Sequence, residues 1–419
     1  MSDELPPAAS GAPVRTGKAK RRHRVLRVIV ISVVVLALVV GVSTVFLVRR
    51  LNGNIETGSF DQFGPGRPER QYKGNGKPLN ILVMGDDTRD GEGNGIDGEG
   101  GGGSDTTILV HLSADRERAY AVSIPRDSIV DRPSCNNGES AAAHDVMWNA
   151  AFNVGGEACT GDQFEQTTDI LLDHYVVIDF NGFGEMVDAV EGVPVCVPED
   201  IVDEPRQIFV PKGNPSVLTG DEALDYVRAR YVGERIEQND ISRIRRQQEF
   251  IGALVRKVKS AGTLTRPDRV VRFLDAATKS LRTDEALGSV TAIAKIALQL
   301  ENIGLDKVQF VTLPTEYFAS DSEFRGKVYW TPQADKIWDL LNEDKELPAT
   351  LIGDTSVSAE GPPTSTDSPS AGESPSSSES SSDQTPPPAS NTPSGTPSTT
   401  PPELDASEST EDATYGVCA

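Results

Sequence analysis

The chain lacks most of the short motifs that identify a common catalytic or binding class. It has four cysteines and none is in a C-x-x-C pair, so the pattern does not favour a zinc ribbon or a thioredoxin-type redox site. Its four histidines show no H-E-x-x-H spacing, no G-x-S-x-G elbow accompanies them, and the P-loop signature is absent. A formal net charge of −23 argues against general nucleic-acid binding, which needs a broad basic face. What remains is an acidic chain with one concentrated cluster of arginines.

One long apolar segment stands near the N-terminus. Residues Val28–Val48 carry no charge, and at about 1.5 Å rise per residue they span a hydrocarbon core of roughly 30 Å. Basic residues are denser before this segment than after it, which places the N-terminus in the cytosol and the rest of the chain outside. A cleaved signal peptide is the alternative, but its apolar region is normally shorter and an A-x-A-like site would follow. The sequence therefore predicts a single-pass protein of the cell membrane.

Composition divides the chain into five parts. We expect a cytoplasmic basic segment (1–27), the membrane helix (28–48), a tether (49–78), an extracellular catalytic domain (79–347) and a tail (348–419). The tail is rich in Ser, Pro and Thr and cannot bury enough apolar surface to offset chain entropy, so it is predicted to be disordered. An even number of cysteines in an exported protein favours disulfides. We favour Cys135–Cys159, because these residues flank one loop-rich insertion, with Cys196–Cys418 as a second pair.

Strand and helix patterns alternate within the domain. Short apolar, β-branched runs predict strands, and Thr160 and Thr219 each open a segment with the capping-box spacing that begins a helix. The predicted strands are Leu79–Met84, Thr106–Leu112, Ala119–Ile124, His174–Phe180 and Val308–Leu313. The predicted helices include Asn181–Val190, Ile236–Lys259, Arg266–Leu281 and Glu285–Leu300. This interleaving indicates the α/β class, a central sheet with helices on both faces.

The arginine cluster lies between Arg228 and Arg246. If the chain is extended from Arg228 to Arg230, both guanidinium groups point to one side, while Arg243 and Gln247 lie one turn apart on a helix face. Two unit charges about 4 Å apart interact by roughly 4 kcal/mol at an effective dielectric constant near 20, so converging arginines need an anion between them. A planar guanidinium matches phosphate oxygens two at a time. The cluster indicates a phosphate site, and pairing with nearby Asp and Glu on a solvated helix surface is the alternative.

Two carboxylates lie at the boundaries of predicted strands. Asp87 follows the first strand and Asp105 enters the second after a glycine-rich loop, so both can face the edge where open α/β sheets bind ligands. Together they can hold a hard divalent cation, Mg²⁺ or Mn²⁺, that keeps waters and bridges phosphate oxygens. Arg126, at the end of the third strand, either joins the phosphate site or pairs with Asp127. These residues predict a metal and phosphate site at one sheet edge.

Taken together, these segments resemble a LytR-CpsA-Psr (LCP) family protein of the actinobacterial type. The matching pieces run in order from about Leu79 to Leu254: LNILVMGDDTR, SDTTILVHL, AVSIPRDS, NAAFNVGG, DHYVVIDFNGFGEMVDAVEGVPVCVP, LTGDEALDYVRARY and DISRIRRQQEFI. The resemblance implies a mixed sheet in an α-β-α domain. It implies a Mg-dependent phosphotransferase that moves a glycopolymer from a polyprenyl-diphosphate carrier to a muramic acid hydroxyl of peptidoglycan, leaving a phosphodiester link. An apolar tunnel for the polyprenyl tail is expected between the sheet and the long helices after Ile236.

The same resemblance implies roles for individual residues by matching motif positions. Asp87 and Asp105 resemble the magnesium-associated aspartates of the family. The implied diphosphate-binding residues are Arg89, Arg126, Arg228, Arg230, Arg243 and Gln247. The implied catalytic residues are Asp105, Arg126, Arg228 and Arg230. Asp105 either takes the proton of the acceptor hydroxyl or only binds the metal, and the sequence does not choose between these roles.

Two positions depart from the family pattern. Gly103 stands where many members have an arginine, and Met147 where many have a lysine. Two positive charges expected beside the diphosphate are therefore missing. This favours one alternative function, a non-catalytic polyprenyl-phosphate-binding or regulatory role in the wall. A second alternative is hydrolysis of a polyprenyl diphosphate at the same metal site, with water as the nucleophile.

Overall fold

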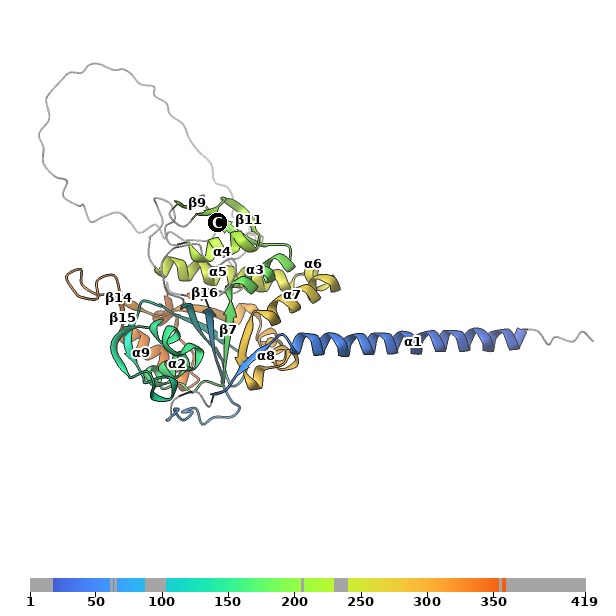
Figure 1. Cartoon of the computed structure of the whole chain (residues 1–419), viewed down its shortest axis with the longest axis horizontal. Coiled ribbons are helices and arrows are strands. Elements are labelled where there is room, and N and C mark those ends of the chain that lie inside the picture. Colours follow the sequence, from blue (N-terminus) through green and yellow to red (C-terminus); the bar gives the residue numbers. More distant parts are fainter. Residues whose placement is uncertain are drawn as a thin grey trace, which may run out of the picture.

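A mixed eight-stranded sheet forms the centre of the protein (Figure 1). The structure, a computed structural model, describes residues 18–60, 63, 66–86, 103–204, 207–229, 240–353 and 356–358. The strand order is β1-β12-β7-β2-β3-β4-β13-β16. These strands are β1 (Glu56–Gly58), β2 (Leu79–Asp86), β3 (Ser104–Leu112), β4 (Ala119–Ile124), β7 (His174–Asp179), β12 (Leu281–Asp284), β13 (Val308–Thr312) and β16 (Ser356–Ser358). β2, β3 and β4 pair antiparallel in succession, whereas β7 with β2 and β4 with β13 are parallel.

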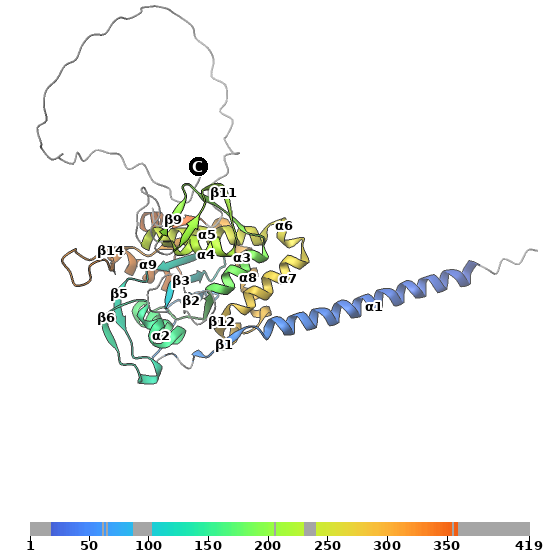
Figure 2. The same cartoon turned by 45° about the horizontal axis from the view of Figure 1, so that its top comes forward.

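Helices cover both faces of the sheet (Figures 1 and 2), which confirms the predicted α/β class. On one face lie α2 (Ala150–Thr168) and α9 (Pro332–Asn342). On the other side lie α3 (Phe180–Ala189), α4 (Gly220–Arg228), α5 (Asp240–Lys259), α6 (Ala261–Leu264) and α7 (Pro267–Lys279). α8 (Val290–Ile303) lies beside the end of the N-terminal helix α1 (Lys18–Asn52), and α10 (Ala349–Ile352) follows α9.

The remaining strands form four two-stranded ribbons outside the main sheet. β8 (Val193–Val197) pairs with β11 (Gly213–Leu218), and β9 (Ile201–Asp203) with β10 (Ile208–Val210). β5 (Ile129–Arg132) pairs with β6 (Ala143–Met147), and β14 (Thr315–Tyr317) with β15 (Val328–Trp330). The sequence patterns did not predict these ribbons.

The two faces of the main sheet are covered to different degrees. Toward α2 and α9, Leu82, Leu109 and Val122 are fully buried in the largest core cluster, together with Phe164. Toward α5 and α8, Val83, Val110 and Val308 lie on central strands but are only half-buried. Central strands of a closed domain normally bury both faces, so this second face has apolar surface that its covering helices leave partly accessible.

The predicted tether is part of the domain rather than a loose connection. β1 pairs with β12 at the edge of the sheet, and Phe63 is 7% exposed, with its ring 6.0 Å from that of Tyr175. Arg67 forms a salt bridge of 2.6 Å with Glu165 on α2. The prediction of a tether over 49–78 was therefore wrong, because a few isolated side chains, not a continuous apolar run, anchor this extended segment.

The domain also continues beyond the predicted boundary at residue 347. Ile352 in α10 is 3% exposed, and β16 adds an antiparallel strand beside β13. Residues 359–419, which hold most of the predicted disordered tail, lie outside the described residues.

The two predicted capping boxes have different outcomes. At Thr219 the prediction is confirmed: its backbone N–H donates to Glu222 Oε2 at 2.9 Å, and α4 begins at Gly220. At Thr160 it was wrong, because α2 already starts at Ala150 and the Thr160 hydroxyl donates to the Gly156 carbonyl at 2.9 Å. A non-helical kink at Gly155 and Gly156 divides α2, so the helix restarts before Thr160 rather than at it.

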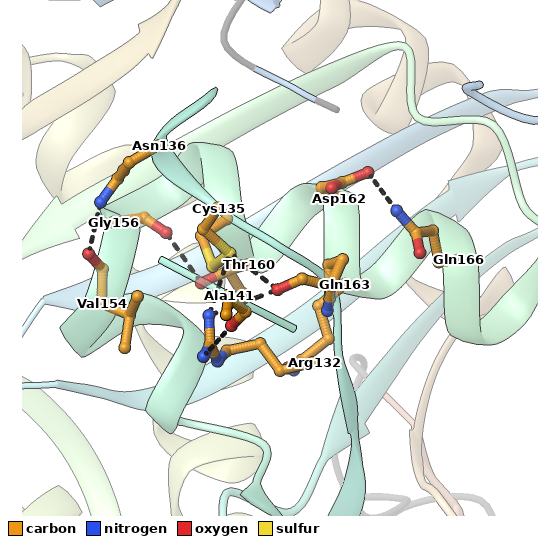
Figure 3. Close-up of a disulfide and its surroundings, with 12 residues drawn as sticks. Arg132, Cys135, Asn136, Ala141, Val154, Gly156, Thr160, Asp162, Gln163 and Gln166 are labelled. Carbon is orange, nitrogen blue, oxygen red and sulfur yellow. Dashed lines mark hydrogen bonds between the residues drawn. A yellow bond between two sulfur atoms is a disulfide. The ribbon is translucent and has the colours of Figure 1, made fainter. Parts of the chain in front are cut away.

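The predicted disulfide between Cys135 and Cys159 is confirmed (Figure 3). It joins the loop between β5 and β6 to α2, and the Asn136 side-chain amide adds a hydrogen bond of 3.0 Å to the Val154 carbonyl. The insertion is thereby attached to the helix that covers the well-packed face of the sheet. The second predicted pair, Cys196–Cys418, includes a residue outside the described part of the chain and stays a prediction.

Candidate diphosphate site

The candidate site lies at the sheet edge where β2 ends and β3 begins. Asp86, the last residue of β2, is paired in register with Ser104, so Asp105 stands at the entrance of β3 beside it. The Asp105 carboxylate accepts a hydrogen bond of 2.5 Å from Arg126 Nη1, and Arg243 Nη1 lies 3.5 Å from its other oxygen. The side chains of Arg243 and Asp105 are 2% and 18% exposed. One partly accessible carboxylate thus holds two arginines from distant parts of the sequence.

Arg126 is positioned by the turn that follows β4. Its carbonyl accepts a hydrogen bond of 3.3 Å from the Asn149 N–H. Asp127, weighed as an alternative partner, lies 3.8 Å from Arg126 Nε and is itself bound by Lys327 at 2.9 Å. The contact of Arg126 with Asp105 is therefore the shorter of the two, and it directs the guanidinium into the site.

Arg243 is carried by α5, which is fixed across the ends of two sheet strands. The fully buried Gln248 amide donates to Ser123 Oγ on β4 at 2.9 Å and to Thr312 Oγ1 on β13 at 3.3 Å. These bonds set the rotation of the helix, and the rotation places Arg243 over the entrance of β3.

α5 also holds the end of the helix that carries Arg228. The Gln247 amide donates to the Val227 carbonyl at 3.2 Å, and Arg246 donates to the Ala229 carbonyl. Both residues are buried, at 7% and 5% exposed. Gln247 was predicted as a diphosphate ligand, but in this structure its amide positions the backbone around Arg228.

Arg228 is the last residue of α4, and its guanidinium carbon lies 4.9 Å from the centre of the Phe180 ring. A guanidinium over an aromatic face is held by the ring quadrupole, which fixes its orientation at the end of α4. Ala229 then has φ −54° and ψ 129°, so the chain leaves the helix in an extended conformation, as predicted for its start. Arg230, Asp87 and Arg89 lie outside the described residues.

A half-buried acid, Glu249, lies beside the arginines of α5. Burial raises the pKa of Glu249 to about 8, against the opposing effects of the Tyr226 hydrogen bond and the Arg246 charge. Burial likewise lowers the pKa of Arg246 to about 10. The Tyr226 hydroxyl donates to Glu249 Oε2 at 3.4 Å. In the sequence, Glu249 is only one of the nearby acids that could pair with the arginines at a surface, because its environment depends on how α4 packs against α5.

The two positions that depart from the family pattern lie just before β3 and at the end of β6. A Cβ placed on Gly103 would lie 2.9 Å from Asn153 Oδ1, so this α2 side chain fills the space that a larger residue would need. Met147 ends β6 and is paired with Ile129. Neither position offers a cation to the site.

The described residues are better suited to a metal ion that is bound partly by the substrate than to one bound by protein side chains alone. Within the described ranges, no group of three or more His, Cys, Asp or Glu could hold a metal ion. Mg²⁺ commonly uses one or two carboxylates and completes its shell with waters and phosphate oxygens. Asp105 supplies one partly accessible carboxylate at the sheet edge, whereas Asp86 is engaged by Arg282 at 3.5 Å.

Comparison with known families gives a match over most of the chain. A model of the LytR_cpsA_psr family matches residues 54–346. A relative described as "Cell wall biosynthesis protein LcpA" from Corynebacterium glutamicum is 30% identical over 322 residues, covering 70% of this chain and 60% of the relative. "Polyisoprenyl-teichoic acid--peptidoglycan teichoic acid transferase TagV" from Bacillus subtilis is 31% identical over 225 residues, covering 52% of this chain and 53% of the relative. The chain thus spans about half to three-fifths of the length of these relatives.

Solved structures resemble the fold. A Streptococcus agalactiae protein superposes with a TM-score of 0.52 at 23% identity, covering 65% of this chain and 90% of that one. A "LytR-Csp2A-Psr enzyme from Actinomyces oris" gives a TM-score of 0.51 at 16% identity, covering 68% and 96%. At these identities the similarity establishes the shared architecture.

Proposed function

Because the chain belongs to the LytR_cpsA_psr family, we propose that it transfers a glycopolymer from a polyprenyl-diphosphate carrier to peptidoglycan. The observation that carries the proposal is the convergence of Arg126 and Arg243 on Asp105 at the sheet edge. Two guanidinium groups that already share one carboxylate are arranged to share phosphate oxygens in the same way. The relatives described as a wall biosynthesis protein and a teichoic acid transferase support it.

In the proposed reaction, an acceptor hydroxyl of peptidoglycan forms a bond to the phosphorus next to the glycopolymer. The bond from that phosphorus to the bridging oxygen breaks, and polyprenyl phosphate leaves. Arg126, Arg228 and Arg243 stabilise the negative charge that develops on the phosphate oxygens, because they are held in place before the reaction. The hydroxyl proton passes to a base, and among the described residues Asp105 is the candidate for this role in the alternative in which it does not hold the metal.

We also propose Mg²⁺ or Mn²⁺ as cofactor, held by Asp105 together with Asp87. When bound, it supplies positive charge to the diphosphate oxygens. The need for a cation is strengthened by Gly103 and Met147, which contribute none.

A site for the polyprenyl tail is supported by the partly accessible face of the sheet. Val83 and Val110 on the central strands, Val308 beside them and Ile251 on α5 are apolar and half-buried. A polyisoprene chain placed against them would remove apolar surface from water, at about 25 cal/mol per Å².

The proposed location is the cell membrane, with the domain outside. The helix α1 contains a span, Val25–Asn52, with a mean hydropathy of 3.0, long and apolar enough to cross a bilayer. The Cys135–Cys159 disulfide is typical of proteins outside the reducing cytosol.

The experiment is transfer of a labelled, lipid-diphosphate-linked glycopolymer to peptidoglycan by the purified full chain. Arg228→Ala should reduce transfer by at least about 100-fold, because removing one preorganised charge-stabilising group costs about 10²–10³ in rate. Lys336→Ala, an exposed cation on α9, is the matched control and should transfer like the parent. Full transfer by a folded Arg228→Ala protein would contradict the proposal.

Product analysis separates the other two candidate functions. Release of the polymer as a free phosphomonoester, with or without peptidoglycan, would identify a phosphohydrolase. Binding of the polyprenyl diphosphate without turnover would identify a lipid-binding or regulatory protein, which is the function favoured by the missing cations at Gly103 and Met147.

A further inference from the structure

The corner formed by the end of α5, α6 and the start of α7 is strongly basic in an acidic protein. Between Arg256 and Arg272 the sequence has six Lys and Arg and one Asp, whereas the whole chain has a net charge of −23. The single carboxylate, Asp268, lies 3.2 Å from Arg266 and 3.4 Å from Arg272, so two cations share it. Arg269 is paired with Glu191. We call residues 256–272 the basic corner.

The basic corner also exposes apolar side chains at its tip. Leu264 is 59% exposed and Val271 is 37% exposed. Local hydrogen bonds hold this geometry: the buried Thr263 hydroxyl and the Ser260 hydroxyl both donate to the Lys257 carbonyl, at 2.9 and 2.7 Å. Leu264 is therefore held outward by a defined turn, between cations that flank it on both sides.

The basic corner lies on the side of the domain from which α1 leaves. α7 is joined to the end of α1, because Arg50 pairs with Asp275 at 3.1 Å and the Asn54 amide donates to Thr278 Oγ1 at 3.0 Å. Figures 1 and 2 both show α6 and the start of α7 on the α1 side, with β9 and β14 away from it. Pro267 is eight residues before Asp275, about 12 Å along a helix. The start of α7 thus lies within about 12 Å of a residue that is bound to the end of α1.

We propose that the basic corner rests on the outer leaflet of the membrane, with Leu264 among the headgroups and the neighbouring cations against anionic lipid phosphates. An apolar tip ringed by Lys and Arg suits an anionic bilayer surface, since burial and charge attraction act together there. The contact would fix the height and rotation of the domain above the membrane. It requires that α1 spans the bilayer, and it is independent of which reaction the domain performs.

The test uses the full chain reconstituted in phosphatidylcholine–phosphatidylglycerol vesicles whose acyl chains carry bromine, a short-range quencher of tryptophan. Leu264→Trp should be quenched at least about threefold more than Val202→Trp, after subtraction of the parent signal. Val202 is the matched control, because it is an apolar residue of similar exposure, 49%, on the distant β9. Flotation of the vesicles reports insertion of α1 separately.

A second variant separates charge attraction from proximity alone. Lys259→Gln, Arg266→Gln and Arg272→Gln, combined with Leu264→Trp, should lower the quenching at least about twofold in the anionic vesicles. Equal quenching of Leu264→Trp and Val202→Trp in vesicles that carry inserted protein would overturn the proposal. So would a Leu264→Trp signal that responds to soluble polyphosphate and not to brominated lipid, because the corner would then be a site for an anionic polymer.

Discussion

At the scale of single residues, Asp105 is the group on which the site depends. It lies within 2.5 Å of one arginine and 3.5 Å of another, and Arg243 is almost fully buried. Without ligand, this carboxylate is the counter-ion that lets the two guanidinium groups approach each other. A diphosphate that enters the site would compete with Asp105 for them, which leaves the carboxylate available for a metal or a proton.

Asp105→Asn should therefore destabilise the protein and make it respond to added anion. We expect a loss of about 2 kcal/mol in the free energy of unfolding, below the about 3–5 kcal/mol for a fully buried pair because Asp105 is 18% exposed. Pyrophosphate without metal should then raise the melting temperature of the variant more than that of the parent. Asp131→Asn, at an exposed carboxylate, is the control and should change little. Equal stabilisation of variant and parent by pyrophosphate would contradict the counter-ion role.

The raised pKa of Glu249 predicts that the free energy of unfolding falls as the pH rises. Its pKa is raised to about 8 in the folded protein from 4.5, so the folded state retains a proton that the unfolded chain releases between these values. The stabilisation is complete below about pH 4.5 and is lost as the pH rises through about 8. Glu249→Gln cannot ionise, so its free energy of unfolding should fall less between pH 6 and pH 9, by on the order of 2 kcal/mol. Glu301→Gln, exposed on α8, should follow the parent, and a parent-like slope in Glu249→Gln would refute the assignment.

At the scale of elements, the central strands could be predicted from sequence with little error. Ala119–Ile124 matches β4 at both ends, and Leu79–Met84 falls within β2. These strands are buried on most of their length, so their sequences are nearly continuous apolar runs. α4 was predictable for a local reason, because Thr219 and Glu222 form the capping box from residues three apart.

The edges of the sheet could not be predicted, because their pairing is determined by contacts distant in sequence. β1 reads ETG and β16 reads SVS, and neither has a strand pattern without the neighbours β12 and β13. The kink at Gly155 and Gly156 was not predicted either. For that reason the helix start was expected at Thr160, whereas α2 begins at Ala150.

The site could be predicted in its chemistry but not in its contacts. Asp105, Arg126 and Arg243 were recognised by residue type and motif, and the structure brings them together. The sequence could not show that Gln247 uses its amide on the Val227 carbonyl, since that choice depends on the distance between α4 and α5. Asp105, Arg126 and Arg243 come together only because β3, the turn after β4 and α5 meet at one edge of the sheet. That meeting is a property of the assembled sheet.

At the scale of the whole molecule, the anchor and the domain are joined by structure rather than by a flexible linker. α1 continues to Asn52, its end is bound to α7 and α8, and β1 enters the sheet four residues later. The orientation of the domain is thus coupled to that of the membrane helix. For an enzyme that takes a lipid-borne donor from the same bilayer, such coupling would hold the site at a constant height above the surface.

A substitution at Phe63 tests whether the segment that follows α1 belongs to the core of the domain. Its ring packs between Phe60, at 4.7 Å, and Tyr175, at 6.0 Å, and Arg67 lies 5.4 Å from its centre. Phe63→Ala should lower the free energy of unfolding by about 3 kcal/mol, the lower end of the cost for a buried aromatic residue. Phe209→Ala is the matched control: it removes the same side chain from β10, where the residue is 56% exposed, and should stay within about 0.5 kcal/mol of the parent. If the two variants unfolded alike, the segment after β1 would be a true tether, and the coupling of anchor to domain would rest on β1 and on the contacts of α1 with α7 and α8.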